Sequence, residues 1–340
     1  MGCFTGTERR ARRLLGLCAV IGVFGFMLAA CDSATSKTAQ ARYVTYYGLG
    51  PDKWATAWLL TRHVDPVGKL IVVDSPAPLP DGIVFDDPSS ALRRVDQRAA
   101  FQVTKDTYRL NSPTLDKMAS VVHEIEINFW NTGGAPEASL IETAYRQLQY
   151  QQGRASVAPE CYLAFFDRVY QVLNEQLSKG RQLTAESLQL GCDELVKNAA
   201  RSADLIPEIP LVDVMGSMAA GRKVIFVDVR EPDEYAEAHI PGALNIPIRD
   251  VSPQLQEHLA GADYVVSYCV KDFRGFEMAK ALAEVGVKNS VIMRPYGIKG
   301  WIAQGLPVVG TQGLSKANAE AELTRCLTAA ESCKTQKGTT

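Results

Sequence analysis

Hydrophobic and polar positions follow two different patterns along the chain, and the change between them indicates two folded regions. Short, nearly continuous apolar runs occur at residues 224–229 and 264–268. Such runs are typical of strands that are covered on both faces of a parallel sheet. The second run leads through a short loop into apolar residues at helical spacing from Phe276 to Gly286. Strand, loop and helix in this order predict an α/β region.

The pattern before this region is mainly helical. Strands are predicted at 42–45 and 70–73, and a helix at 52–63. Residues 204–210 contain prolines at two positions and are predicted to form a linker. From Pro113 onwards apolar residues recur at helical spacing, which predicts helices over 113–126, 136–150, 159–178 and 184–202.

These patterns predict a fold class and a division into domains. A mainly helical α+β domain is expected at 42–204. An α/β domain is expected at 205–312, with a central parallel sheet flanked by helices. A C-terminal helix and tail are expected at 313–340.

The strongest chemical signal is a cysteine at the turn between strand and helix. Cys269 ends the apolar run and opens a loop that continues to Gly275. Loop amides and the helix N-terminus would converge on the sulfur, lower its pKa and hold an anion attached to it. Arg274 adds a fixed positive charge suited to an oxyanion. A buried strand cysteine is the alternative interpretation, and the flanking residues decide between the two.

The flanking motifs occur in a recognisable order. They are Asp228–Tyr235, His239–Pro247, Tyr296–Trp301 and Gly305–Val308. Together with the cysteine loop they make residues from about 206 to 310 resemble the rhodanese family. The resemblance implies that Cys269 and Arg274 are catalytic and that a substrate-binding loop is formed by Val270, Lys271, Asp272, Phe273 and Gly275.

Loop length favours one chemistry within this resemblance. Cys269 to Arg274 spans six residues, as in the sulfurtransferase members, whereas related phosphatases and arsenate reductases carry one residue more. We therefore expect the Cys269 thiolate to take the outer sulfur of an anionic donor such as thiosulfate. The resulting persulfide would pass its sulfur to cyanide or a thiol, with main-chain amides of residues 270–275 stabilising its charge.

Other residues of the motifs have supporting or altered roles. Asp228 and Arg230 are predicted to form a structural salt bridge, and His239 to hold a turn by hydrogen bonds. Asp272 stands where the family often has glycine, and its carboxylate is expected to repel anions. Tyr296 replaces the first glycine of the closing motif, and Ala238 a glycine before His239. These departures leave the use of thiosulfate open.

The helical region has a resemblance of its own. Lys53–Pro66 and Val122–Phe129, followed by Ala135–Ala138, resemble the C-terminal domain of ChrB-type chromate-resistance proteins over about 43–175. That family commonly has histidine between these two halves, which residues 92–101 lack. We therefore predict no metal and no cofactor.

His123 and Glu126 are the weak candidates for a metal site in this region. They lie one helical turn apart and could share a face. A hydrogen-bonded polar patch on the helix is the favoured alternative. The tryptophans at 54, 58 and 130 are predicted to belong to the core.

The N-terminal residues predict export. A basic start and an apolar stretch within residues 1–30 are typical of a signal peptide, and the stretch ends in a sequence that resembles a lipobox. Cys31 would then carry lipid, with residues 31–41 as a flexible tether. Asp32 resembles an inner-membrane retention signal, so the periplasmic side of the inner membrane is favoured over the outer membrane. An uncleaved anchor is the alternative.

Charge and cysteine content agree with export. Residues 1–30 hold four arginines and one glutamate, so their removal changes the formal net charge from −2 to −5 and disfavours nucleic acid as a partner. In an oxidising compartment the remaining cysteines could form two disulfides. The favoured pairs are Cys161 with Cys192, on an antiparallel helix pair, and Cys326 with Cys333. Buried thiols are the alternative.

Three functional hypotheses follow. The leading one is an exported, lipid-anchored sulfurtransferase with a small-molecule sulfur donor, a thiol or cyanide acceptor and an accessory chromate-resistance-like domain. The second is a non-catalytic, membrane-tethered protein that binds or senses an oxyanion, a metal or redox state through Cys269. The third is a phosphatase or arsenate-reductase-like enzyme. The physiological donor and acceptor, the ligand of residues 42–204 and the oligomeric state stay open.

Overall fold

A computed structural model describes most of the chain after its first 39 residues. The described residues are 40–74, 77–87, 89–95, 97–128, 134–154, 156–192 and 206–328. We refer to residues 40–192 as the N-terminal region and to residues 206–328 as the C-terminal region. The predicted signal peptide and the lipidated Cys31 lie outside the described residues. Among the residues that are described, no helix has the length and apolar character needed to cross a membrane.

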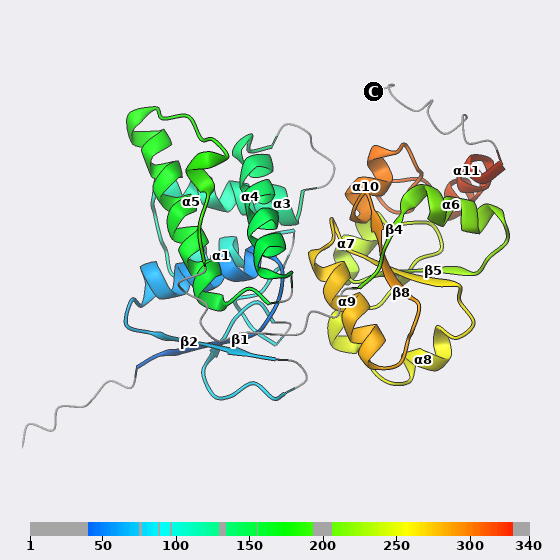
Figure 1. The fold of residues 1–340 in the computed structure, drawn as a ribbon, viewed down its shortest axis with the longest axis horizontal. Helices are drawn as coiled ribbons and strands as arrows, with labels where there is room; N and C mark the ends of the chain where they lie inside the picture. Colours follow the sequence, from blue (N-terminus) through cyan, green and yellow to red (C-terminus); the bar gives the residue numbers. More distant parts are fainter. Residues whose placement is uncertain are drawn as a thin grey trace, which may run out of the picture. The chain divides into compact units, whose positions relative to one another are not determined.

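The N-terminal region contains a small parallel sheet with helices on one side of it (Figure 1). Strand β1 (Arg42–Tyr46) lies between β2 (Lys69–Val73) and β3 (Ile83–Val84) and runs parallel to both. Helix α1 (Pro51–Leu59) continues as a π-helical turn, η1 (Leu60–Val64). Trp54 and Trp58 on α1 are buried, as predicted for core residues.

Four further helices complete this region. They are α2 (Ala100–Thr107), α3 (Pro113–Glu126), α4 (Glu137–Gln152) and α5 (Pro159–Lys179). Proline in the first turn of α3 and α5 costs no hydrogen bond there, because the first amides of a helix have no partner within it. Helices α2, α3 and α5 pack against α1. Helices α3, α4 and α5 confirm three of the four helices predicted from position 113 onwards, with bounds within two residues of those expected.

The fourth predicted helix, at 184–202, is wrong over the part that the structure describes. Only a single 3-10 turn, η2 (Glu186–Leu188), forms, and residues 189–192 are irregular. Leu188 and Cys192 are buried, whereas Gln189 and Gly191 are exposed. This alternation suits an extended segment that packs along α5 better than a helix. Residues 193–202 lie outside the described part.

The C-terminal region is an α/β fold around a five-stranded parallel sheet with the order β4-β8-β7-β5-β6. This confirms the predicted fold class. Its strands are β4 (Glu208–Pro210), β5 (Val224–Asp228), β6 (Leu244–Asn245), β7 (Tyr264–Tyr268) and β8 (Ser290–Arg294).

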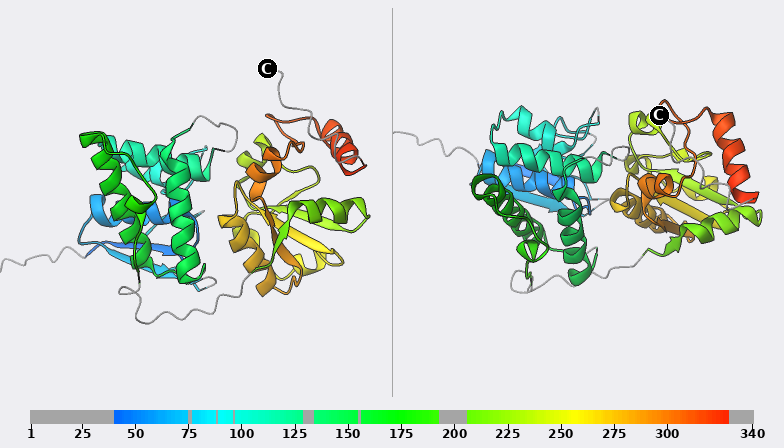
Figure 2. Two further views of the ribbon diagram at one scale, coloured as in Figure 1. Left: turned by 45° about the horizontal axis from the view of Figure 1, so that its top comes forward. Right: turned by 90° about the horizontal axis from the view of Figure 1, so that it is seen from above.

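Helices cover both faces of this sheet, as the two views of Figure 2 show. They are α6 (Leu211–Ala219), α7 (Pro232–Glu237), α8 (Leu255–His258), α9 (Phe273–Glu284), α10 (Gly297–Ala303) and α11 (Lys316–Thr328), with a 3-10 turn η3 (Ile248–Asp250). Side chains alternate along β7, so Val265 packs on the side of α9 and Val266 on the side of α6 and α11.

Strand β4 corrects the predicted linker. Residues 208–210 pair in parallel with β8 at the edge of the sheet. Ile209 is buried, and its neighbours Glu208 and Pro210 point outwards. Pro210 is tolerated in β4 because the outer side of an edge strand faces no neighbouring strand, so the missing amide of proline costs no hydrogen bond there.

Helix α9 joins the cores of the two regions. Phe273, Phe276 and Ala279 on α9 belong to the same apolar cluster as Trp54 and Tyr145 of the N-terminal region. This packing brings the helix that follows Cys269 against the helical region.

Candidate functional site

Cys269 lies where the central part of the sheet opens into a helix. It follows directly on β7, which is paired on both sides by β5 and β8. Helix α9 begins at Phe273, three residues earlier than predicted, so Phe273, Arg274 and Gly275 form its first turn. The carboxyl end of a parallel strand and the N-terminus of a helix therefore meet at the thiol, an arrangement suited to an anion.

The start of α10 orients the loop. The amides of Ile298 and Lys299 donate to the carbonyl oxygens of Cys269 and Val270, at 2.9 and 3.0 Å. Gly297 approaches these carbonyls so closely that a Cβ there would lie 2.1 Å from the oxygen of Lys271. The loop carbonyls are thus held on the side of α10.

The loop amides are consequently available. Within the described residues, no protein oxygen accepts a hydrogen bond from the amides of residues 270–275. The Gly275 amide is a donor beside the sulfur and lowers the pKa of Cys269. Gly275 also lets the helix approach the strand, because a Cβ there would lie 3.1 Å from the oxygen of Ser267. We call the amides of residues 270–275, at the start of α9, the main-chain cradle; of these, the Gly275 amide acts on the sulfur and favours its negative charge.

The thiol itself is enclosed. Cys269 is 1% exposed and packs with Val265 and Met278. Burial raises the pKa of Cys269, although Arg274 and the Gly275 amide lower it. The expectation of a lowered pKa is therefore wrong for this conformation. The cost of placing a thiolate away from water exceeds what one cation and one amide return.

Arg274 is held by a carboxylate of the Asp228–Tyr235 motif. Its Nη1 and Nη2 donate to the two oxygens of Glu234 on α7, at 2.9 and 3.0 Å. Burial would raise the pKa of Glu234, but Arg274 together with Arg94 and Arg230 outweighs it, and the pKa falls to about 2. Glu234 is thus a site residue that we missed, and its position in the Asp228–Tyr235 motif was the available signal.

Lys271 and Asp272 contact the N-terminal region. Lys271 pairs with Glu142 on α4. Asp272 is buried and pairs with Arg146 on α4, at 2.5 Å, and with Arg154 just beyond it. Burial would raise the pKa of Asp272, but the two arginines hold it below its usual range. The two arginines pair with Asp272, but its charge still raises the pKa of Cys269, in the direction expected of a carboxylate that repels anions.

Asp228, Arg230 and His239 keep this end of the sheet in place. Arg230 Nη2 lies 2.6 Å from Asp228 Oδ2, and both side chains are fully buried. Arg230 also donates to the carbonyl oxygen of Ala238. His239 Nδ1 lies 2.8 Å from the carbonyl oxygen of Tyr235. The predicted structural salt bridge and the hydrogen-bonded turn are both present.

Comparison with known proteins agrees with both resemblances. The family model of the rhodanese-like domain matches residues 212–304, and that of the ChrB C-terminal domain matches residues 43–173. A thiosulfate:glutathione sulfurtransferase of Homo sapiens is 30% identical over 99 residues, which are 24% of this chain and 85% of that protein.

The chain belongs to the rhodanese-like family. A protein named sulfurtransferase from Allochromatium vinosum is 29% identical to this rhodanese-like protein over 109 residues, 32% of this chain and all of that one. The crystal structure of BH2092 from Bacillus halodurans is 28% identical and covers 33% of this chain and 82% of that chain, with a TM-score of 0.29. The family model and the two relatives named sulfurtransferases support sulfurtransferase-type chemistry at the level of the family.

The weak metal candidates of the ChrB-like residues have other partners. His123 Nδ1 lies 3.2 Å from Gln102 Oε1, and burial lowers the pKa of His123. Glu126 pairs with Arg94 at 3.2 Å. The described part of the chain contains no group of three or more histidine, cysteine or acidic side chains arranged to hold a metal. The geometry is that of the hydrogen-bonded polar patch.

The predicted disulfides have different outcomes in this rhodanese-like protein. Cys161 and Cys192 are neighbours, with Cys161 Sγ 4.0 Å from the carbonyl oxygen of Cys192, but both are thiols and not a disulfide. The antiparallel helix pair that we expected to join them is absent, because Cys192 lies in irregular chain. Cys326 is disulfide-bonded, and its predicted partner Cys333 lies outside the described residues, as does Trp130.

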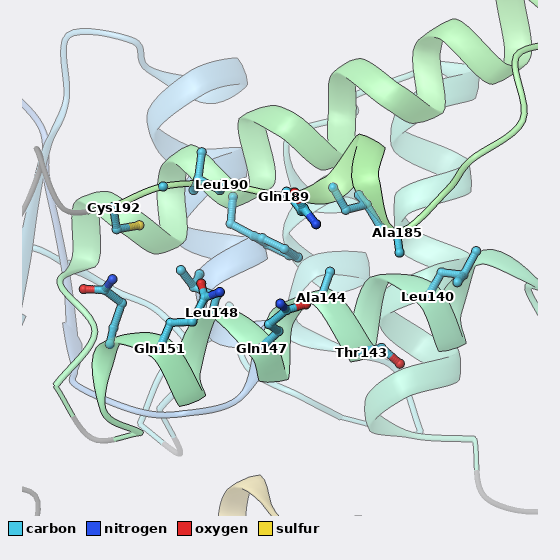
Figure 3. A pocket seen from close by; sticks show the side chains of 14 residues that line it. Leu140, Thr143, Ala144, Gln147, Leu148, Gln151, Ala185, Gln189, Leu190 and Cys192 are labelled. Carbon is cyan, nitrogen blue, oxygen red and sulfur yellow. The ribbon is translucent and has the colours of Figure 1, made fainter.

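A cavity of about 590 Å³ opens elsewhere, in the N-terminal region. It lies between α4, α5 and the segment 185–192, with Gln147, Leu148 and Cys192 among its lining residues (Figure 3). No residue of the cysteine loop lines it. The cavity is therefore separate from the rhodanese-like site.

Proposed function

We propose that this rhodanese-like protein moves sulfane sulfur through a persulfide on Cys269. The observation that carries the proposal is the cradle of amides from residues 270–275. Among the described residues no protein oxygen accepts from these amides, and that of Gly275 acts on the sulfur of Cys269. Such a cradle stabilises the charge of a persulfide as it does that of a thiolate. The loop length of six residues supports sulfur over phosphate as the bound group.

The reaction would be a double displacement. The Cys269 thiolate attacks the outer sulfur of a donor such as thiosulfate, the sulfur–sulfur bond of the donor breaks, and sulfite leaves with the electron pair. An acceptor thiolate or cyanide then attacks the outer sulfur of the persulfide. The Cys269 thiolate is released, and the acceptor leaves as a persulfide or as thiocyanate.

Charged residues would assist each step. Arg274 lowers the pKa of the thiol and supplies positive charge beside the transferred sulfur. Lys271 would receive an anionic donor once the donor displaces Glu142 from it. Asp228 and Arg230 keep the end of the sheet rigid. The ChrB-like residues would serve as an accessory domain for a ligand of unknown identity.

Peptide mass spectrometry tests the proposal, with the full chain treated before digestion. After treatment with a sulfur donor, the peptide that contains Cys269 should gain about 32 Da, the mass of one sulfur. The Cys161 peptide provides the control, because that thiol is buried outside the cradle. Turnover from thiosulfate to cyanide or a thiol should be lost in Cys269→Ser. An unmodified Cys269 with every donor would favour the non-catalytic sensing or binding function instead.

We also propose that the protein is lipid-anchored on the periplasmic side of the inner membrane. The basic and apolar pattern of residues 1–30 and the lipobox-like sequence before Cys31 support this. The wild-type chain should partition into the membrane fraction, and Cys31→Ser should release it. If Cys31→Ser stays in the membrane fraction, an uncleaved anchor replaces the lipid.

A further inference from the structure

One face of α4 contacts three consecutive residues of the cysteine loop. Glu142 pairs with Lys271, and Arg146 pairs with Asp272. Tyr145 packs edge to face against Phe273, with ring centres 5.8 Å apart. Positions 142, 145 and 146 lie on the same side of a helix. All these contacts fall within a single compact unit, residues 40–340.

The charges of this contact centre on Asp272. Its side chain is 1% exposed, and it receives Arg146 on one side and Arg154 on the other. Both arginines also cover aromatic rings of α9, because Arg146 lies 4.5 Å from the ring centre of Phe273 and Arg154 lies 4.4 Å from that of Phe276. Removing a partner from such a buried ion pair destabilises the protein, because an uncompensated charge is left in the interior.

The departures of this loop from the family pattern lie at the same contact. Asp272 stands where the family often has glycine, and Tyr296 stands where the closing motif has one. Tyr296 lies beneath Arg146, with 5.1 Å between the guanidinium and the ring centre. Both substitutions therefore add a group that Arg146 contacts, which explains them as adaptations to α4.

The nucleophile beside this contact is itself enclosed. Cys269 is 1% exposed, so neither a donor nor an acceptor reaches the sulfur in this conformation. Lys271 and Arg274, the cations of the loop, are both occupied by carboxylates. Turnover at Cys269 thus requires a more open loop, and residues 271–273 of that loop are the ones that α4 contacts.

We propose that Arg146 and Arg154 control access to Cys269 by holding Asp272. The effect of this control on turnover rests on the proposed sulfur transfer, whereas the contacts of Asp272 do not depend on it. In the closed form the sulfur is sheltered from water, donors and acceptors. Release of Asp272 frees the loop, after which Cys269 becomes reachable.

Alkylation of the full chain tests the closure without any sulfur donor. The rate of iodoacetamide modification at Cys269 is followed peptide by peptide in the wild type and in the double variant Arg146→Gln, Arg154→Gln. We expect the rate at Cys269 to rise about tenfold or more, because the released loop exposes the thiol. Arg181→Gln is the matched control, since Arg181 forms an exposed pair with Glu175 in the same region.

Cys161 and Cys192 report on the fold in the same digest, because both are buried within the N-terminal region. Their rates should stay at the wild-type value. If their rates rise together with that at Cys269, the N-terminal region has partly unfolded in the double variant. The milder variant Arg154→Lys then replaces it, and a rate that rises at Cys269 but not at Cys161 and Cys192 supports the proposal. Equal rates at Cys269 in the wild type and in a folded variant overturn the proposal.

A second measurement separates access control from the proposed sulfur transfer. Turnover from thiosulfate to cyanide should rise in the double variant together with alkylation, because both reactions need access to the sulfur. Unchanged turnover with faster alkylation would refute the control of turnover by this contact. Absence of all turnover with faster alkylation would refute sulfur transfer and leave the access control standing.

Discussion

At the scale of single residues, the site combines a buried thiol with groups that favour its ionisation. Burial raises the pKa of Cys269, and Arg274 is the strongest group that lowers it. Burial would lower the pKa of Arg274, but its pairing with Glu234 raises that pKa well above the usual value and keeps the charge. The thiolate therefore depends on Arg274 for its formation in the closed form.

Replacing Arg274 should make the thiol harder to ionise. In Arg274→Gln we expect the pKa of Cys269 to rise further, because a cation that favours the thiolate is lost. The pH dependence of alkylation at Cys269 measures this, with its midpoint shifted upwards in the variant. Lys280→Gln on the same helix is the control, since Lys280 pairs with Glu284 at the surface. A midpoint that stays in place would remove Arg274 from the ionisation of the thiol.

Glu277 makes the stability of the protein depend on pH. Burial raises the pKa of Glu277 to about 7, against the amide of Leu49 and Lys53, which lower it. The unfolded chain loses this proton near the ordinary value of 4.5, whereas the folded chain keeps it to about 7. Because the folded form binds more protons in this window, stability falls as pH rises from 4.5 to 7.

The variant Glu277→Gln should remove that loss, since a neutral amide oxygen can still accept from Leu49. Its free energy of unfolding relative to wild type should improve by about 2–3 kcal/mol between pH 4 and pH 8. Urea unfolding at the two pH values measures the difference. The nearby Asp86 and Glu126 are present in both chains and cancel in the comparison. A difference that does not change with pH would contradict a raised pKa at Glu277.

At the scale of elements, local patterns predicted most of the helices and strands. The bounds of β7 and α3 agree with the predicted 264–268 and 113–126, because their apolar spacing and flanking residues act within a few positions. The helix at 184–202 failed, since an alternating segment was taken for a helical one. Strand β4 was missed because its pairing with β8 bridges residues far apart in the sequence.

The same distinction between local and long-range signals applies to the site. Cys269 and Arg274 stand in one loop, and their motif identified them. Glu234 lies 40 positions from Arg274, and Arg146 lies 126 positions from Asp272. Nothing in the local pattern around α4 indicates a partner in the cysteine loop. Burial of the thiol, which reversed the expected direction of its pKa, also depends on contacts of this kind.

The start of α10 provides a test of how elements position the loop. Gly297 has a φ of +64°, and a Cβ there would lie 2.1–2.6 Å from the carbonyl oxygens of Lys271, Val270 and Cys269. Gly297→Ala should therefore lose about 1–2 kcal/mol from backbone strain and about 1–3 kcal/mol more from the clash with the loop. It should also reduce sulfur transfer, because the amide cradle is displaced.

The control for this variant is Gly242→Ala. Gly242 has a φ of +76°, but a Cβ there would have no atom within 4 Å, so only the backbone strain applies. Denaturant unfolding and turnover are compared for both variants. Equal losses in the two chains would show that contact of α10 with the loop carbonyls does not hold the cradle.

At the scale of the whole molecule, the rhodanese-like and ChrB-like parts share a core. The apolar cluster that contains Trp54 and Tyr145 also contains Phe273 and Phe276 of α9. The helix that forms the cradle for Cys269 therefore has one face on its own sheet and another on the helical region. Stability and access to the site are consequently linked through α9.

This sharing predicts cooperative unfolding. Residues 40–340 should unfold in one thermal transition, because separating the two regions would expose the rings of Phe273 and Phe276 to water and break the buried pairs of Asp272. The double variant Arg146→Gln, Arg154→Gln weakens this link and should divide the calorimetric trace into two transitions, whereas Arg181→Gln should keep one. Two transitions already in the wild type would mean that the shared cluster does not couple the regions. In that case Cys269 would owe its burial to its own region, where it packs with Val265 and Met278.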